Sequence, residues 1–294
     1  MADEESAPPP SRDQRSPSVF AVVLTFNAPA DSLARCVAAI QHQTLAPSEI
    51  LVIDNNGDHP VDGTLLAGAV PVRVSRLSEN DGPAGGFAAG MEEFLRTGYD
   101  YLWAFDDDIQ PDAQCLQMLL TDLAQDPEHV VVMPVALDAT TGERFRDQDG
   151  WWGVLIGRPA IQTCGFPKTE LFFGLEDQEY FIDRLPLAGF PLARSESAIV
   201  RARVRDEFEI APWKFYYFSR NLVYQYLYDR RHMRFLTRVK SLVNQLARWW
   251  RNALDSKSQR PQKLSYFARG LIDGALGRLG KRVDPDRADR PRVI

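Results

Sequence analysis

The 294-residue sequence has no uninterrupted apolar run of the roughly 18 to 20 residues that a helix needs to cross a bilayer, which excludes an integral membrane protein. Its three cysteines are an odd number without CxxC spacing, so neither a disulfide framework nor a cysteine metal site is expected. Residues 1–18 lack the apolar core of a signal peptide and are rich in proline and serine, which predicts a disordered lead-in. The expected location is therefore the cytoplasm.

Basic residues are scarce in the first part of the chain, and acidic residues are scarce in its last part. Residues 1–227 carry 34 acidic side chains against 17 basic ones, a net charge of −17, whereas residues 228–294 carry 6 against 17, a net charge of +11. The acidic part would repel a phosphate backbone, and no zinc-finger or RNA-binding motif is present, so we expect no nucleic-acid partner. The four histidines form no spaced metal cluster. The basic tail is the part of the chain whose charge calls for an explanation.

Short apolar runs recur along the first half of the chain and predict strands that are buried on both faces. Helical patterns lie between them, and strands that alternate with helices predict an α/β fold with a mostly parallel central sheet. The predicted strands are 19–24, 50–53, 72–74, 101–105 and 130–135, and the predicted helices are 31–43, 88–96 and 112–124.

Polar residues follow four of the predicted strands. They are TFN at 25–27, DNNG at 54–57, ENDGPAGG at 79–86 and DDD at 106–108. One such strand end is typical of a turn, because turns favour Asn, Asp and Gly. Four of them at one edge of a sheet favour a ligand site, since open α/β sheets bind ligands beyond the carboxyl ends of their strands.

The Asp triplet is the most specific of these features. Three adjacent carboxylates repel one another at the end of a buried strand unless a cation or hydrogen-bond donors compensate them. Hard oxygen ligands select Mg²⁺ or Mn²⁺, and alternation along an extended segment allows Asp106 and Asp108 to face one ion together. A solvated turn before the helix at Asp112 is the alternative.

The glycine-rich stretch 82–90 would let the backbone approach an anionic ligand at the start of a helix. Neither a phosphate-binding P-loop nor a dinucleotide-binding fingerprint fits it, because no GK[ST] follows and the first strand ends without glycine. Asn80, Gly85 and Gly86 are the candidate donor-binding residues here. Close packing of the helix is the alternative.

Two further segments offer chemistry. The acidic sequence 176–179 follows an aromatic stretch, and a carboxylate beside apolar surface can serve as a general base, for which we choose Asp177 over Glu176. The alternative is the charged first turn of a helix. Trp151 and Trp152 could form an aromatic platform for a sugar ring, or could equally be core residues.

The order TFN, VIDNN, ENDGPAGGFAAGM, FDDD and GLEDQEY resembles the inverting, nucleotide-sugar-dependent glycosyltransferases of family 2, which have a GT-A fold. GGFAAGM, FDDDIQPDA, DGWWGVLI and YYFSRN are more particularly similar to bacterial galactofuranosyltransferases and rhamnosyltransferases. The resemblance implies that Thr25, Asn27 and Asp54 hold the nucleotide base and ribose. It also implies that Asp106 and Asp108 bind the diphosphate through Mn²⁺ or Mg²⁺, and that Asp177 is the base.

The activity that the resemblance implies is a single displacement with inversion. A sugar would move from a nucleotide-diphosphate donor, of the UDP-galactofuranose or dTDP-rhamnose type, to a glycan or polyprenyl-linked acceptor near Trp151, Trp152 and Glu176. The family's usual metal-binding histidine is absent, and Arg201 or Arg203 stands in its neighbourhood. A sugar nucleotidyltransferase and a degenerate, non-catalytic scaffold subunit are the alternatives.

The basic tail contains apolar residues at three-to-four spacing between 231 and 257, which predicts an amphipathic helix. Such a helix suits peripheral contact with the inner face of an anionic membrane, and docking onto the protein's own acidic part is the alternative. The predicted organisation is the lead-in 1–18, a GT-A catalytic domain 19–228 and the helical tail 229–294. The catalytic domain would divide into a nucleotide-sugar half, 19–135, and an acceptor half, 136–228.

Overall fold

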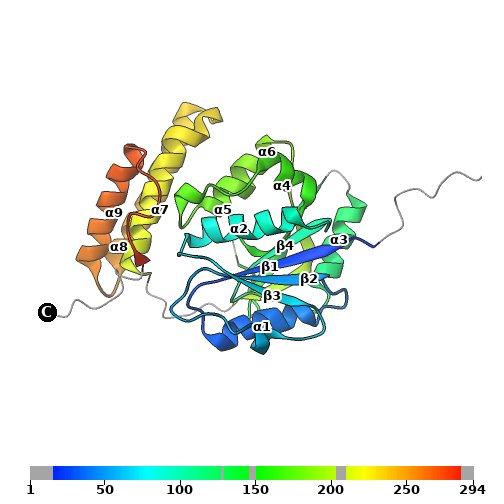
Figure 1. The fold of residues 1–294 in the computed structure, drawn as a ribbon. Coiled ribbons are helices and arrows are strands. Elements are labelled where there is room, and N and C mark those ends of the chain that lie inside the picture. The colour runs from blue at the N-terminus through cyan, green and yellow to red at the C-terminus, as the bar shows by residue number, and fades with distance from the viewer. Residues whose placement is uncertain (1–15, 127–128, 146–149, 203–209, 286–294) are drawn as a thin grey trace, which may run out of the picture.

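The computed structural model describes residues 16–126, 129–145, 150–202 and 210–285. They form one eight-stranded sheet with helices on both faces and a group of helices at the C-terminal end (Figure 1). The strands are β1 (Val19–Thr25), β2 (Glu49–Asp54), β3 (Val72–Arg76), β4 (Tyr101–Asp106), β5 (Gln110–Pro111), β6 (Val131–Asp138), β7 (Trp152–Gly157) and β8 (Leu192–Ala202). The longer helices are α1 (Ala30–Gln41), α2 (Gly82–Arg96), α3 (Cys115–Gln125), α4 (Arg158–Cys164), α7 (Pro212–Tyr224), α8 (Phe235–Asp255) and α9 (Arg260–Ala275). Short helical turns are η1 (Gly63–Leu66), η2 (Thr169–Leu171), α5 (Glu176–Gln178), η3 (Glu179–Arg184), α6 (Leu185–Leu187), η4 (Gln225–Asp229) and η5 (Arg230–His232).

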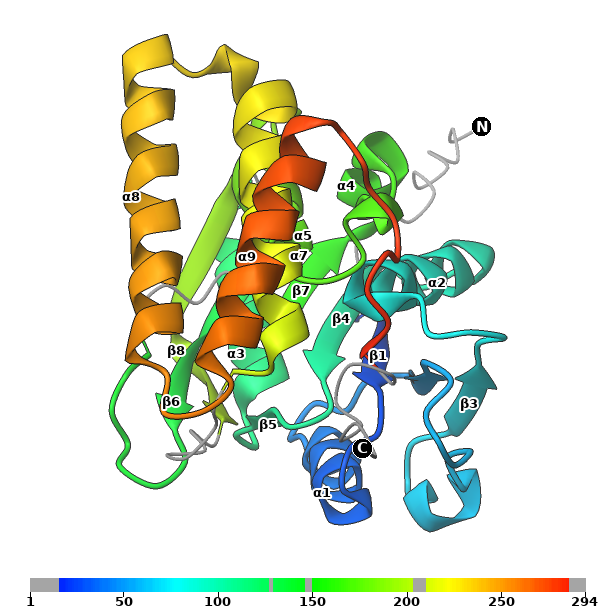
Figure 2. The ribbon, with the colours of Figure 1, turned by 90° about the vertical axis from the view of Figure 1, so that its left-hand side faces the viewer.

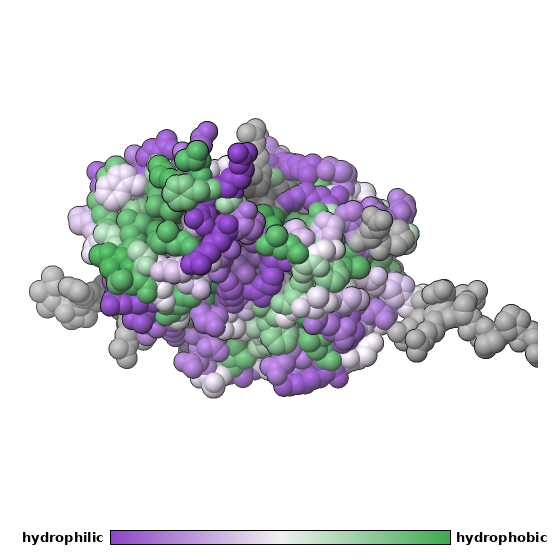
Figure 3. Space-filling model, turned by 90° about the horizontal axis from the view of Figure 1, so that it is seen from above, coloured by the Kyte–Doolittle hydropathy of each residue, from purple (hydrophilic) through white to green (hydrophobic). Residues whose placement is uncertain are grey.

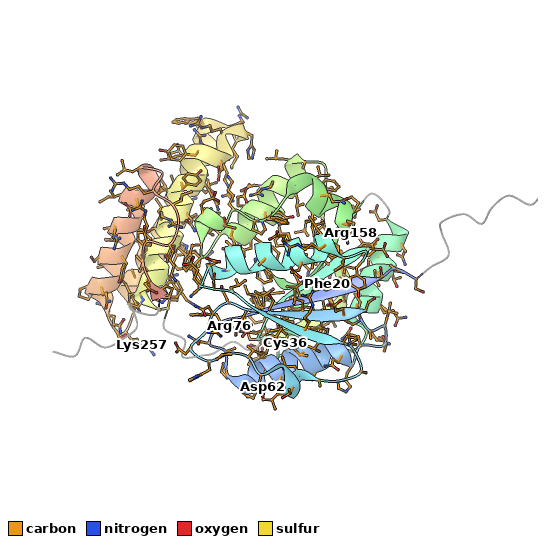
Figure 4. All side chains as sticks on the ribbon, in the orientation of Figure 1. Phe20, Cys36, Asp62, Arg76, Arg158 and Lys257 are labelled. Carbon is orange, nitrogen blue, oxygen red and sulfur yellow. The ribbon has the colours of Figure 1, made fainter. Side chains whose placement is uncertain are left out.

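The strands that the apolar runs predict are all present, and the sheet order is β3-β2-β1-β4-β7-β6-β8-β5. The first four of these strands run parallel. Every residue of β1 is buried, because alternate side chains enter two different cores. Phe20 packs toward α2 and α4, whereas its neighbour Ala21 belongs to the core that contains Cys36 of α1 (Figure 4). Strands buried on both faces explain why the pattern is continuous rather than alternating.

The second half of the sheet is mixed rather than parallel. β7 runs antiparallel to β4 and to β6, and β8 runs parallel to β6 but antiparallel to the short β5. Neither β7 nor β8 is among the predicted strands. β7 begins with a tryptophan that we assigned to a platform, and β8 carries several polar residues on its exposed positions. Both strands depend on pairing with distant segments, which local patterns do not reveal.

The C-terminal helices pack beside the sheet and against one another (Figure 2). α9 lies close to α7 because glycine allows it: a Cβ on Gly270 would lie 2.4 Å from the carbonyl oxygen of Tyr216. α8 is the predicted amphipathic helix, and its inner stripe, including Trp249, packs on aromatic and aliphatic side chains of α7. The Trp249 and Phe218 rings stack with centroids 4.0 Å apart. In the described part of the chain, no helix combines the length and apolarity required to cross a membrane.

The carboxyl ends of β1 to β4 point toward these C-terminal helices. Arg76, the last residue of β3, marks this edge in Figure 4, and Arg158, which follows β7, marks the opposite edge. At this edge the start of α2 meets the segment after η2, where the Ala84 amide donates a hydrogen bond to the Phe172 carbonyl. This edge is the one at which the sequence places its polar strand ends.

Candidate active site

A pocket of about 550 Å³ opens beyond the ends of β1 and β2. Its wall combines apolar side chains from α1 and η1 with polar groups of the strand ends, including Thr25, Asn27 and Asp54. A volume in this range is typical of small-molecule sites. The structure thus brings together the three residues that the resemblance assigns to the nucleotide. The remaining lining residues are Ala28, Leu33, Ala34, Gly57, Asp58, His59, Pro60, Val61, Asp62, Leu65 and Leu66.

Asp54 holds the loop that forms one wall of this pocket. Its carboxylate is 2% exposed, accepts hydrogen bonds from the amides of Gly57 and Val61, and pairs with Arg76 at 2.6 Å. Asn27 has a positive φ of 51° and accepts a hydrogen bond from the amide of Asp58 at 2.7 Å. Both side chains therefore fix the loop that forms one wall. Sequence reasoning missed Arg76, although a basic residue at the end of a strand was the available signal.

Asp106 lies two strands from Asp54, because β1 is paired with β2 on one side and with β4 on the other. The Cα atoms of the two aspartates are thus about 10 Å apart, which is two strand spacings. The residues that line the pocket include neither Asp106 nor Asp108, so the Asp triplet lies beside the cavity and not in its wall. A ligand that used both would have to extend across the end of β1.

The Asp triplet forms a tight turn after β4. The Asp106 amide donates to the Trp151 carbonyl at 2.8 Å, and the Ile109 amide donates back to the Asp106 carbonyl. Burial raises the pKa of Asp106 well above its usual range, and Asp108, Asp107, Glu176 and Asp177 raise it further. These largest electrostatic influences on Asp106 are all negative, so the cluster fits a cation. The described residues nevertheless contain no preformed set of three acidic, histidine or cysteine ligands for a metal ion.

The acidic sequence after the aromatic stretch comes within electrostatic reach of the Asp triplet. Burial raises the pKa of Asp177 to about 6, and two backbone amides, those of Gln178 and Asp177 itself, partly oppose the shift. Burial also raises the pKa of Glu176 to about 8, with the charge of Asp177 as the next cause. Glu176 Oε2 and the indole nitrogen of Trp151 are both buried, and hydrogen bonding from Trp151 partly opposes the rise in the pKa of Glu176. At neutral pH Glu176 is therefore mostly protonated, whereas Asp177 is mostly deprotonated and can accept a proton.

The two tryptophans point to opposite sides. Trp151 is 2% exposed and stacks on Phe87 with centroids 4.0 Å apart, so its ring belongs to the core and offers no platform to a sugar. That part of the prediction is wrong, because neighbours at the start of a strand face opposite ways. Trp152 is half-buried beside the acidic cluster: a Cβ placed on Gly150 would lie 3.2 Å from Asp177 Oδ2 and 3.8 Å from Trp152 Cδ1.

Asn80, Gly85 and Gly86, which we predicted to approach the donor at the start of α2, instead make contacts within the protein. The Asn80 side chain accepts a hydrogen bond from the Gly82 amide, and the Asn80 carbonyl accepts one from Lys281 Nζ at 3.1 Å. A Cβ on Gly86 would lie 2.3 Å from the Leu24 side chain, and one on Gly85 would lie 2.4 Å from Asp81 Cβ. The alternative of close helix packing is therefore the one these contacts support.

Of the two arginines that stand near the position of the missing histidine, the structure describes only Arg201. Arg201 makes a two-pronged ion pair with Asp112, at 2.7 and 2.9 Å, which is possible because β5 pairs with β8. It is thus engaged at the rim of the sheet rather than at the acidic cluster. Arg203 lies outside the described residues.

Comparisons with known proteins match the first half of the chain to one family. The model of "Glycosyl transferase family 2" matches residues 20–174. Galactofuranosyltransferase GlfT1 of Mycobacterium tuberculosis is 44% identical over 108 residues, 35% of this chain and 34% of the relative, and its counterpart in Mycolicibacterium smegmatis is 36% identical over 104 residues, again 35% and 34%. The matched region thus spans about a third of the length of these relatives.

Solved structures resemble the whole fold at low identity. TarS of S. aureus superimposes with a TM-score of 0.59 at 15% identity, over 88% of this chain and 49% of TarS. The mannosyltransferase PcManGT from Pyrobaculum calidifontis, solved in complex with GDP-Man and Mn²⁺, superimposes with a TM-score of 0.55 at 14% identity, over 90% of this chain and 88% of that one. At these identities the likeness shows the GT-A fold alone.

Proposed function

Because the chain belongs to glycosyl transferase family 2, we propose that it moves a sugar from a nucleotide-diphosphate donor to an acceptor hydroxyl with inversion at the anomeric carbon. One observation carries the proposal: a pocket of nucleoside size, an acidic turn and a carboxylate of raised pKa, Asp177, lie around one edge of the sheet. The three parts correspond to donor binding, stabilisation of the leaving group and activation of the acceptor.

The nucleoside would occupy the pocket that Thr25, Asn27 and Asp54 line, with its diphosphate extending across the end of β1 toward Asp106. This direction follows from the strand order, since β1 lies between β2 and β4. We propose UDP-galactofuranose as the donor, because relatives at 36% and 44% identity are named galactofuranosyltransferases. A dTDP-rhamnose donor is the competing outcome of the test below.

Mn²⁺ or Mg²⁺ fits the acidic turn, since the strongest influences on Asp106 are negative and these ions need few protein carboxylates. Asp106 and Asp108 would hold it, and when bound it would neutralise the charge that develops on the leaving diphosphate. Neighbours of the same fold support a metal: GalNAc-T7 was solved with UDP, GalNAc and Mn²⁺.

Asp177 would accept the proton of the acceptor hydroxyl as that oxygen attacks the anomeric carbon from the face opposite the diphosphate. Its oxygen Oδ1 is engaged by the Gln178 amide at 2.7 Å, which leaves Oδ2, on the side of Gly150 and Trp152, to face the acceptor. Trp152 then offers apolar surface to a glycan, while Trp151 supports the turn from within the core.

The outer face of α8 supports peripheral contact of the enzyme with an anionic bilayer, where a polyprenyl-linked acceptor would lie. Leu236 is 79% exposed and Val243 57% exposed, and basic residues such as Lys240 and Arg251 lie on the same helix. Figure 3 shows apolar and hydrophilic side chains side by side over the C-terminal helices, at the left of the view. A helix of this kind binds lipid through apolar burial and charge attraction together.

The donor proposal is tested by thermal shift with UDP-, GDP- and dTDP-sugars, each with and without Mn²⁺, followed by NMR of the product. We expect UDP-galactofuranose with Mn²⁺ to raise the melting temperature most, because a ligand of the native state stabilises it. The product should have the anomeric configuration opposite to that of the donor. Retention of configuration, or no released nucleoside diphosphate with any donor, would refute the assignment.

The membrane proposal is tested by sedimentation with vesicles of anionic or zwitterionic lipid. We expect the full chain to bind the anionic vesicles only, and Leu236→Glu with Val243→Glu to abolish binding. Leu187→Glu is the matched control, since Leu187 is 64% exposed on α6 rather than α8. Equal sedimentation of the double variant and the unaltered protein would disprove the role of α8.

A further inference from the structure

Three buried polar side chains of the α7–η4 segment donate hydrogen bonds to the backbone that leads to Asp177. Arg220, Asn221 and Gln225 are each 0% exposed. Polar side chains so deeply buried are costly unless they are bonded. Here most of the donated bonds go to main-chain carbonyls of residues 170–175, while Gln225 Oε1 has no partner in the described part of the chain. We refer to these three side chains as the carbonyl clamp.

Asn221 forms the centre of the clamp. Its Nδ2 lies 3.0 Å from the carbonyl oxygens of Leu171 and Phe173 and 2.7 Å from that of Gly174. Its Oδ1 accepts a hydrogen bond from Arg220 Nε at 2.8 Å, which fixes the amide so that the donating nitrogen faces the loop. Gln225 extends the row, since its Nε2 donates to the carbonyl of Leu175 at 2.8 Å, directly before Glu176.

Arg220 joins the loop to the C-terminal segment. Its Nη2 donates to the Leu171 carbonyl at 2.6 Å and its Nη1 donates to the Gly280 carbonyl at 2.6 Å, while the Gly280 amide donates to the carbonyl of Glu170 at 2.7 Å. The guanidinium lies 4.8 Å from the centroid of the Tyr217 ring. Figure 2 shows this segment, in red, returning past α7 toward the sheet.

The clamped loop has an unfavourable backbone conformation. Phe172 and Leu175 have positive φ angles of 59° and 68°, a region that side chains other than glycine rarely adopt. Such a conformation persists only where its surroundings enforce it, and it is typical of functional sites. The clamp donates hydrogen bonds to carbonyls directly beside Phe172 and to those of Gly174 and Leu175. These hydrogen bonds hold the loop in its unfavourable conformation.

We propose that Arg220, Asn221 and Gln225 are positioning residues that hold Asp177 in its catalytic place through the carbonyls of the loop before it. The inference rests on the proposed function, in which Asp177 is the base. The clamp does not contact the nucleoside pocket, whose described wall comes from residues 25–66. Loss of the clamp should therefore slow the chemical step while leaving donor binding intact.

The experiment compares Asn221→Asp and Asn221→Leu in the full chain. The aspartate keeps the shape of the side chain and the oxygen that accepts from Arg220, but it lacks the NH₂ group that donates to the loop carbonyls. The leucine lacks both the accepting oxygen and the donating NH₂ group. Ser219→Ala is the matched control, because it removes a buried hydroxyl of α7 that lies 3.0 Å from the Phe267 carbonyl of α9 and does not involve the loop. All variants are measured well below their melting temperatures, with circular dichroism to confirm folding.

For both Asn221 variants we expect kcat to fall by about tenfold to a hundredfold, since small displacements of a reacting group have effects of this size, while the UDP dissociation constant changes less than about threefold. Ser219→Ala should lower the melting temperature with kcat retained. Hydrogen exchange of amides 171–178 should accelerate in the Asn221 variants and not in the control.

Unchanged kcat in both Asn221 variants would overturn the proposal, as would an equal loss in Ser219→Ala. Hydrogen exchange separates this outcome from failure of the proposed function. If the unaltered protein transfers no sugar but the loop amides still open in the Asn221 variants, the clamp exists and the reaction is misassigned. If the amides are unaffected while transfer is normal, the function stands and the clamp does not.

Discussion

Asp54 and Asp106 end two buried strands on either side of β1, yet the protein treats the two carboxylates in opposite ways. Asp54 is paired with Arg76 and with two backbone amides. Asp106 has four other carboxylates as its largest electrostatic influences, and its pKa is raised well above the usual range. The charge of the first carboxylate is compensated by groups of the protein, whereas the largest influences on the second all oppose its charge.

Under the proposed function, this difference separates a structural from a chemical role at one edge of the sheet. A paired aspartate stabilises the fold and shapes the nucleoside pocket before any ligand arrives. A repelled one costs stability in the free protein, and such a cost is typical of groups that act on a ligand. The predictions below test whether this contrast holds, and the largest effects come first.

Asp177→Asn should have the largest effect on activity. The amide cannot accept the proton of the acceptor, so we expect kcat to fall by about 10²- to 10⁴-fold, the usual contribution of a general base. Donor binding, measured by isothermal titration with UDP, should stay the same because Asp177 does not line the nucleoside pocket. Transfer at the normal rate would show that the base lies elsewhere.

Asp54→Asn should have the largest effect on stability. It leaves Arg76 and the pocket loop without the charge that holds them, and hydrogen bonds to charged groups contribute about 1.5–3 kcal/mol. Because Arg76 is 31% exposed, we expect a loss near the lower limit, measured by urea unfolding. Asp58→Asn is the control at an exposed position of the same loop, and an equal loss there would remove the special status of Asp54.

Much of the parallel half of the fold was predictable, because strands such as β1 lie between two helical layers and therefore show a continuous apolar pattern. The approach of Asp177 to Asp106 was implied only by resemblance, since the two are far apart in the sequence. Alternation along a strand predicts that Trp151 and Trp152 face opposite ways, but it does not reveal which of the two faces the core. The roles of the donor-binding residues stay predictions.

The carbonyl clamp shows another limit of sequence reasoning. The motif YYFSRN contains Arg220 and Asn221 among aromatic residues, and polar residues at buried helix positions are a usable signal. Their partners, however, are main-chain carbonyls of a loop some fifty residues earlier. Carbonyls are identical in every residue, so no side-chain pattern marks them. Only the packed structure shows that this helix supports the loop of Asp177.

The dependence of the rate on pH sharpens the contrast between the two regions. Asp177 has a pKa of about 6 in the folded protein, and a base acts only when deprotonated, so kcat should fall about tenfold for each pH unit below 6 and level off above it. The UDP dissociation constant is measured in parallel to show that the pocket is unaffected. A flat rate between pH 5 and 7 would contradict the assignment of Asp177.

Asp106→Asn should have a smaller effect on stability, of opposite sign to Asp54→Asn. It removes a charge that its neighbours repel, so we expect the free energy of unfolding at pH 8 to rise by about 0.5–2 kcal/mol. The folded-state pKa of Asp106 is raised, so the unaltered protein loses stability as pH rises above the unfolded-state value, and the gain should shrink toward acid pH. Mn²⁺ with UDP should stabilise the unaltered protein more than the variant. If Asp106→Asn instead destabilised the protein as Asp54→Asn does, the two aspartates would both be structural, and the acidic turn would need another explanation than a cation.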